Sequence, residues 1–113
     1  MNIQIFGLKK CSETRKAQRF FKERRIPVHF IDLSQKEMSK GELRSVAARV
    51  PLEDLIDTTG RRFIEKGLTH AALNAARIET LLLGDALLIR TPVVRNGKEA
   101  TVGHCPEVWK TWS

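Results

Sequence analysis

The chain has only two cysteines among its 113 residues, Cys11 and Cys105. Two thiols are too few for the disulfide framework of a small secreted domain, and they suit a reducing cytosol. No apolar run approaches the roughly 20 residues of a membrane span, and the first residues lack the charged and apolar regions of a signal peptide. We therefore expect a cytoplasmic protein without a membrane segment.

The signatures of several common binding sites are also missing. The histidines, cysteines and carboxylates show no metal-ligand spacing, and no glycine-rich loop is present to hold a phosphate. There is no zinc-finger spacing, basic zipper or aromatic-stacking motif, although the net charge of +7 would suit a nucleic acid. The sequence thus predicts no metal and no bound cofactor, and it argues against a nucleic-acid partner.

The positive charge gathers near the beginning of the chain, mostly on one predicted helix. The basic residues there are Lys9, Lys10, Arg15, Lys16, Arg19, Lys22, Arg24 and Arg25. Such a face suits phosphates, an acidic protein partner or an anionic thiol such as glutathione. A merely solvated basic face is the alternative interpretation.

The length fits one domain, residues 1–113, large enough to bury roughly two thirds of its unfolded surface. Residues 2–7 alternate between apolar and polar and predict a strand. Residues 12–25 show helical periodicity that ends before Pro27, and residues 28–32 predict a second strand. This order indicates a right-handed βαβ unit with parallel strands.

The middle of the chain, about 39–84, is expected to be entirely helical. Ser39 and Glu42 have the spacing of a capping box, which marks a helix start. The expected helices cover 40–49, short turns near 51–56 and 62–66, and a long apolar-faced segment from Thr69 to Leu83 ended by Gly84.

The last third predicts short strands and a terminal helix. Strands are expected over 86–90 and 92–95, and Asn96-Gly97 is a strong hairpin signal leading into 99–102. A helix follows from Pro106. The complete order predicts an α/β fold with a thioredoxin-like mixed sheet of about four strands and an all-helical insertion between its βαβ and ββα halves.

Cys11 lies at the seam between the first strand and the first helix. The unpaired N–H groups and the dipole at a helix N-terminus favour an anion, so the pKa of a thiol placed there falls and thiolate forms. Arg15 follows one turn later, where it can face the sulfur, and Lys9 and Lys10 add positive charge. A packed, inert cysteine is the alternative, but we interpret Cys11 as a reactive nucleophile assisted by Arg15.

The segment Cys11-Ser12-Glu13-Thr14-Arg15-Lys16-Ala17, with Pro27 and Val28 a helix length later, resembles the ArsC/Spx family. That family holds arsenate reductases linked to glutaredoxin, related glutathione-linked thiol reductases and Spx-type regulators. The likeness continues through Leu55–Gly60, Leu88–Val94 and Val102–Glu107. It implies glutathione as a co-substrate and glutathione or glutaredoxin as the partner.

The departures from the family pattern concern its oxyanion site. The arsenate reductases hold the oxyanion with three arginines, and this chain has Thr59, Thr91 and His104 at those positions. Threonine and a mostly neutral histidine are weak replacements for a guanidinium group. Arg90, next to Thr91, would compensate only if the backbone turned it inward, as would Arg61 or Arg62. The resemblance therefore implies substrate-binding roles for Thr14, Arg90, Thr91, Pro92 and His104, but poor arsenate reduction.

The same resemblance also implies roles for Pro92 and Cys105. In thioredoxin-like proteins the proline matching Pro92 is cis and lies against the active cysteine, and a trans proline opening an edge strand is the alternative. Cys105 follows His104, so it would lie near the rim of the Cys11 pocket. It is then either a resolving thiol that pairs with Cys11 or a half-buried packing residue.

Thr14 stands where Spx-type regulators carry their second cysteine, so a Cys-x-x-Cys disulfide is excluded. Its hydroxyl either donates to the thiolate of Cys11 or belongs to an ordinary helix face. A lone cysteine is the monothiol pattern, which needs an external thiol to resolve the mixed disulfide. We expect a monothiol oxidoreductase acting on disulfides or glutathione adducts. The alternative is a non-enzymatic regulator that docks a protein such as RNA polymerase through its basic first helix.

Overall fold

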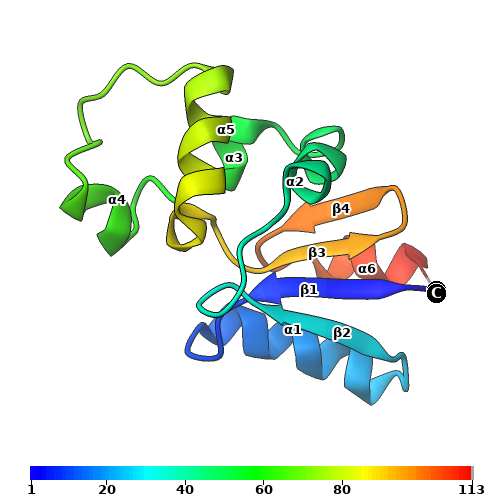
Figure 1. Ribbon diagram of the computed structural model, residues 1–113. Helices are drawn as coiled ribbons and strands as arrows, with labels where there is room; N and C mark the ends of the chain where they lie inside the picture. Colours follow the sequence, from blue (N-terminus) through cyan, green and yellow to red (C-terminus); the bar gives the residue numbers. More distant parts are fainter. Residues whose placement is uncertain (113) are drawn as a thin grey trace.

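The computed structural model describes residues 1–112. Its four-stranded sheet has the strand order β2-β1-β3-β4 (Figure 1). The central strand β1 (Ile3–Gly7) runs parallel to β2 (Val28–Asp32) and antiparallel to β3 (Val93–Asn96), and β4 (Glu99–Val102) pairs antiparallel with β3. This arrangement confirms the predicted thioredoxin-like mixed sheet.

One face of the sheet is covered by α1 (Ser12–Glu23) and α6 (Pro106–Trp109). Side chains alternate across a strand, so Ile3 and Ile5 point toward this face and enter its core. Trp109 fills the middle of that core, and its indole N–H donates to the Thr101 hydroxyl at 2.8 Å. The two helices are thereby fixed on the side of the sheet that carries both cysteines.

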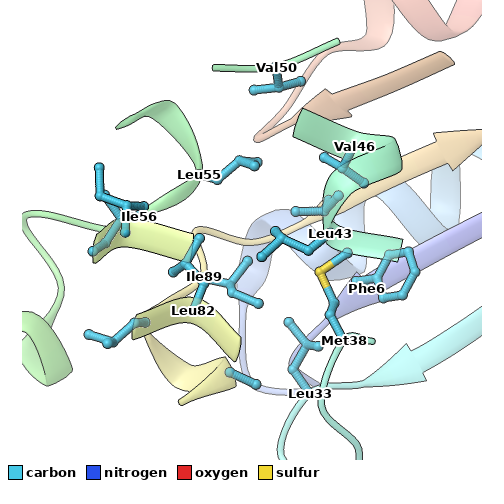
Figure 2. Packing of buried hydrophobic residues seen from close by; sticks show 14 of the residues in the cluster. Phe6, Leu33, Met38, Leu43, Val46, Val50, Leu55, Ile56, Leu82 and Ile89 are labelled. Atoms are coloured by element: carbon cyan, nitrogen blue, oxygen red, sulfur yellow. The ribbon is translucent and has the colours of Figure 1, made fainter. Parts of the chain in front are cut away.

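The helical insertion covers the opposite face and holds the larger core. Phe6 points from β1 into this core, where Figure 2 shows it near Met38, Leu43 and Val46. The Ser39–Glu42 capping box is present, since each residue's side chain accepts a hydrogen bond from the other's backbone N–H. The helices of the insertion are α2 (Lys40–Ala47), α3 (Leu52–Leu55), α4 (Arg61–Glu65) and α5 (Ala75–Gly84).

The long helix predicted from Thr69 to Leu83 is wrong in its first part. The helix α5 begins only at Ala75, because the Asn74 side chain caps it by accepting from the N–H of Arg77 at 2.8 Å. Ala71 and Leu73 supplied the apolar spacing that suggested an earlier start. They pack against the larger core from an irregular segment.

The strand predicted over 86–90 is also wrong. Ala86–Leu88 form a single 3₁₀ turn, η1, because the Asp85 side chain accepts from the N–H of Leu87 at 3.1 Å and starts that turn. Ile89 then makes an isolated antiparallel bridge with Ile56. This bridge ties the insertion to the segment that leads into β3.

The C-terminal part follows the prediction. The Asn96-Gly97 hairpin joins β3 to β4, and Gly97 adopts the positive φ of 59° that such a turn requires. A final 3₁₀ turn, η2 (Lys110–Trp112), follows α6. Across residues 1–112, no helix has both the length and the apolar character needed to cross a membrane.

Candidate active site

Cys11 is the N-cap residue of α1. Its backbone is extended, with φ −76° and ψ 119°, and its N–H donates to the Leu8 carbonyl at 3.0 Å, which closes the turn after β1. The side chain is half-buried, and the thiol is free. The seam between strand and helix therefore holds the sulfur at the positive end of a twelve-residue helix.

Thr91 approaches this sulfur from a distant part of the chain. Its hydroxyl donates to Cys11 Sγ at 3.3 Å, and the Cys11 thiol faces the Thr91 carbonyl oxygen at 3.9 Å. The Thr91–Pro92 peptide bond is cis, which confirms what the family resemblance implied. Thr91, which precedes the cis Pro92, thus lies directly against the candidate nucleophile, while the Arg90 side chain is exposed.

Thr14 reaches the same sulfur from within α1. Its side chain is fully buried, and its hydroxyl accepts from the Leu8 N–H at 3.4 Å. That bond occupies a lone pair and leaves the hydroxyl proton for Cys11. Gly7 makes this position possible, because a methyl group there would lie 2.5 Å from Thr14 Oγ1 and Cγ2.

The pKa of the Cys11 thiol is set by opposing effects. Burial raises it, but the Thr14 and Thr91 hydroxyls and the backbone N–H groups of Thr14 and Glu13 stabilise the thiolate. The hydrogen bonds prevail, so the pKa lies below the usual value of a cysteine. The thiol accepts no capping hydrogen bond from the helix backbone, but the N–H groups of Thr14 and Glu13 favour its thiolate form.

Arg15 does not have the role that the sequence suggested for its charge. Its Nη1 donates to the Lys9 carbonyl oxygen at 3.3 Å, and its charge is not among the effects that lower the pKa of Cys11. The guanidinium group stays exposed on the first turn of α1, on the same turn as the thiol. Arg15 remains a predicted site residue, as a cation available to a substrate.

Cys105 is also half-buried and also an N-cap residue, in its case of α6. Its thiol donates to the Val102 carbonyl oxygen at 3.3 Å. Burial raises its pKa above the usual value, and the nearby charge of Glu13 raises it too, while the Thr101 hydroxyl and the charge of Arg90 only partly offset this. Cys105 is a free thiol held in its protonated form, and no disulfide joins it to Cys11.

The other predicted substrate-binding side chains are turned to different neighbours. The His104 ring packs edge-on against Trp109, with 5.7 Å between the ring centroids. The Arg90 guanidinium lies beside Gly103, where an added methyl group would be 3.4 Å from its Nη2. The Thr59 hydroxyl donates to Asp57 Oδ1 at 3.3 Å. Within residues 1–112, no group of three or more histidines, cysteines or carboxylates is arranged to hold a metal ion.

Comparison with known proteins identifies the family to which this chain belongs. The family model described as "ArsC family" matches residues 6–112. The chain belongs to the ArsC family. It is 26% identical over 110 residues to an arsenate reductase of Haemophilus influenzae, covering 95% of each chain, and 26% identical over 107 residues to the uncharacterised protein YusI of Bacillus subtilis, covering 91% of each. The solved structure of the YFFB protein superposes with a TM-score of 0.87 at 22% identity and 97% coverage of both chains.

As an ArsC-family site, this one has the candidate nucleophile Cys11 and, at positions 59 and 104, a threonine and a histidine. Thr91, which precedes the cis Pro92, meets Cys11 after the end of β1. The Thr59 hydroxyl donates to Asp57, and the His104 ring packs on Trp109.

Sequence reasoning missed the two residues that position Thr14. Gly7 gives the threonine side chain its space, and the Leu8 N–H orients its hydroxyl. A glycine at the end of a buried strand is the one signal that would have suggested close approach of another group. Nothing in the sequence around Leu8 marks its N–H as a donor.

Proposed function

We propose that this ArsC-family protein is a monothiol oxidoreductase that exchanges Cys11 with disulfides and glutathione adducts. The observation that carries the proposal is the pair of threonine hydroxyls, Thr14 and Thr91, directed at the sulfur of the N-cap residue Cys11, whose pKa is lowered. A thiolate available near neutral pH is the species that attacks a disulfide.

The exchange has two balanced steps. The Cys11 thiolate attacks the glutathione sulfur of a mixed disulfide, the old S–S bond breaks, and the substrate leaves as a thiolate that takes a proton from water. Glutathione thiolate, or a glutaredoxin thiolate, then attacks the Cys11–glutathione disulfide. This step restores the Cys11 thiolate and releases oxidised glutathione, or its mixed disulfide with glutaredoxin.

The surroundings of Cys11 support disulfides over arsenate as the substrate. A multiply charged oxyanion needs several charged donors around it. The hydroxyl of Thr91 points at the sulfur itself, the His104 ring packs on Trp109, and Arg90 lies beside Gly103. The two sulfur atoms of a disulfide carry no such charge. Their exchange requires only a thiolate and space for the disulfide beside it.

The test is a glutathione-exchange assay with a glutathionylated peptide, glutathione and glutathione reductase. We expect turnover by the wild type and by Cys105→Ser, and none by Cys11→Ser. Arsenate with glutaredoxin and glutathione should be reduced far more slowly than the peptide. Equal rates for arsenate and peptide, or activity in Cys11→Ser, would contradict the proposal.

The basic charge of α1 favours the second candidate, a binding module that docks a protein partner. None of Arg15, Lys16, Arg19 and Lys22 forms an ion pair within the described chain, residues 1–112. A non-enzymatic regulator would keep this surface and show no glutathione exchange. The assay above separates the two functions.

A further inference from the structure

The cations of α1 are arranged on one side of the helix, and that side begins at the thiol. Successive residues of an α-helix are rotated by about 100°, so positions 15, 18, 19 and 22 fall within about 100° of one another, and Cys11 directly precedes the helix. Arg15, Arg19 and Lys22 are exposed there. We name Cys11, Arg15, Gln18, Arg19 and Lys22 the thiol face of α1.

The cations of the thiol face form no ion pair within the described residues 1–112. Several cations of the helical insertion are paired, as with Arg44 and Glu79 at 3.2 Å and Arg62 and Asp85 at 2.6 Å. Neighbouring like charges one turn apart destabilise a helix slightly. The charges of Arg15, Arg19 and Lys22 therefore do not stabilise the fold through ion pairs. They remain available to attract an anionic partner.

The far end of the thiol face meets an apolar groove. The groove has a volume of about 330 Å³ and lies between α1 and the edge strand β2. Gln18 and Lys22 stand on its helix side. Its apolar lining is Ile26, Pro27, Val28 and Phe30. One aliphatic or aromatic side chain fits such a volume, and Lys22 would bind a carboxylate beside it.

From these observations we infer that the thiol face and its groove dock an acidic protein segment that brings its disulfide to Cys11. This inference rests on the proposed function and adds the substrate class. Cys11 and Lys22 are eleven positions apart, which is about 16 Å along a helix and about five residues of extended chain. The expected substrate thus carries carboxylates within five residues of its cysteine. It also carries an apolar residue at about the fifth position from that cysteine.

A protein segment fits this surface better than a nucleic acid does. The face starts at a thiol whose exchange chemistry needs a sulfur partner, which a protein supplies. The exposed aromatic surface that would stack a base is also limited, because the Arg24 guanidinium lies 3.7 Å above the Phe20 ring. Binding of an oligonucleotide is kept as an outcome of the test.

The experiment compares glutathionylated peptides that are symmetric about their cysteine. One has glutamates at the second and third positions and leucine at the fifth on each side; a second replaces glutamate by lysine, and a third replaces leucine by serine. We expect kcat/KM for the acidic peptide to exceed that for the lysine peptide about tenfold at low salt and to fall toward it at ~0.5 M salt. The serine peptide should be several-fold slower than the leucine peptide.

Charge-reversal variants locate the effect. Arg19→Glu/Lys22→Glu should remove the preference for the acidic peptide, while Lys40→Glu/Lys98→Glu, an equal charge change at exposed sites away from α1, should keep it. A fluorescent acidic peptide without cysteine should bind the wild type and the control and bind Arg19→Glu/Lys22→Glu about tenfold more weakly.

Equal rates for all three peptides, or an unchanged preference in the α1 variant, would overturn the docking inference. So would an oligonucleotide that binds where the acidic peptide does not. If no peptide is exchanged while the cysteine-free acidic peptide still binds to α1, the proposed function fails and the docking surface stands.

Discussion

The two cysteines form a natural comparison, because each is half-buried and each is the N-cap residue of a helix. The pKa of Cys11 is lowered and that of Cys105 is raised. Burial raises both values, so burial does not separate them. The difference comes from which groups surround each sulfur.

Four hydrogen bonds lower the pKa of Cys11, whereas only one, with the Thr101 hydroxyl, lowers that of Cys105. Thr14 and Thr91 direct hydroxyls at Cys11, and two helix N–H groups add to them. Cys105 instead donates its proton to the Val102 carbonyl, and its helix α6 has four residues with Pro106 in the first turn. Proline has no N–H to offer an anion. A helix N-terminus alone therefore does not make a reactive thiol.

The largest expected effect is on turnover. Cys11→Ser removes the only thiolate of lowered pKa in the described chain, so glutathione exchange should fall at least ~10³-fold, the scale on which enzymes lose an essential nucleophile. Cys105→Ser should keep the wild-type rate within about twofold. Mass spectrometry after mild oxidation with glutathione should find the adduct on Cys11. An internal Cys11–Cys105 disulfide would instead make Cys105 a resolving thiol.

The second effect is on the pH dependence of alkylation, followed residue by residue with iodoacetamide and peptide mapping. The rate at Cys11 should reach half its maximum below pH ~8.5, the ordinary thiol value, and that at Cys105 above it. Because the folded pKa of Cys11 is below the unfolded one, its thiolate stabilises the fold above the unfolded pKa. That stabilisation is lost as pH falls through the folded pKa. A shared midpoint would refute the contrast.

The third effect isolates one hydroxyl. Thr14→Val keeps the shape of the side chain but removes the donor and leaves the Leu8 N–H without its acceptor. We expect the pKa of Cys11 to rise and alkylation at pH 7 to slow several-fold, with a loss of about 1 kcal/mol in the free energy of unfolding from the half-buried N–H left unpaired. Thr14→Ser keeps the hydroxyl and is the matched control. If Val and Ser variants react alike, the hydroxyl has no role at the sulfur.

The sequence was sufficient where the cause of a structure is local. The change from strand to helix periodicity around Cys11 placed the thiol at a helix N-terminus, and Asn96-Gly97 predicted its hairpin. The sequence-based prediction failed where another local signal was stronger than the apolar periodicity. The Asn74 cap, for example, starts α5 at Ala75 rather than at Thr69. The approach of Thr91 to Cys11 joins residues 80 positions apart, so only the family resemblance pointed to it. The Gly7–Thr14 contact depends on packing that no spacing encodes.

The smallest effect tests whether the whole helix or only its first turn acts on Cys11. At the other end of α1, Arg25 has a positive φ of 58°, and the N–H groups of Arg25 and Ile26 donate to the carbonyls of Lys22 and Phe21. This pattern is a Schellman motif, whose left-handed residue is usually glycine. Arg25→Gly relieves the strain of a side chain there and should raise the free energy of unfolding by up to about 1 kcal/mol in urea titration.

The same variant should leave the alkylation midpoint of Cys11 unchanged. The groups that lower the pKa of Cys11 lie at Glu13, Thr14 and Thr91, and the influence of a helix terminus fades within one turn. Arg25→Ala, which keeps a Cβ in the left-handed conformation, is the control for the loss of charge. A shift of the midpoint in Arg25→Gly but not in Arg25→Ala would show that the stability of the entire helix, rather than its first turn, sets the reactivity of the thiol.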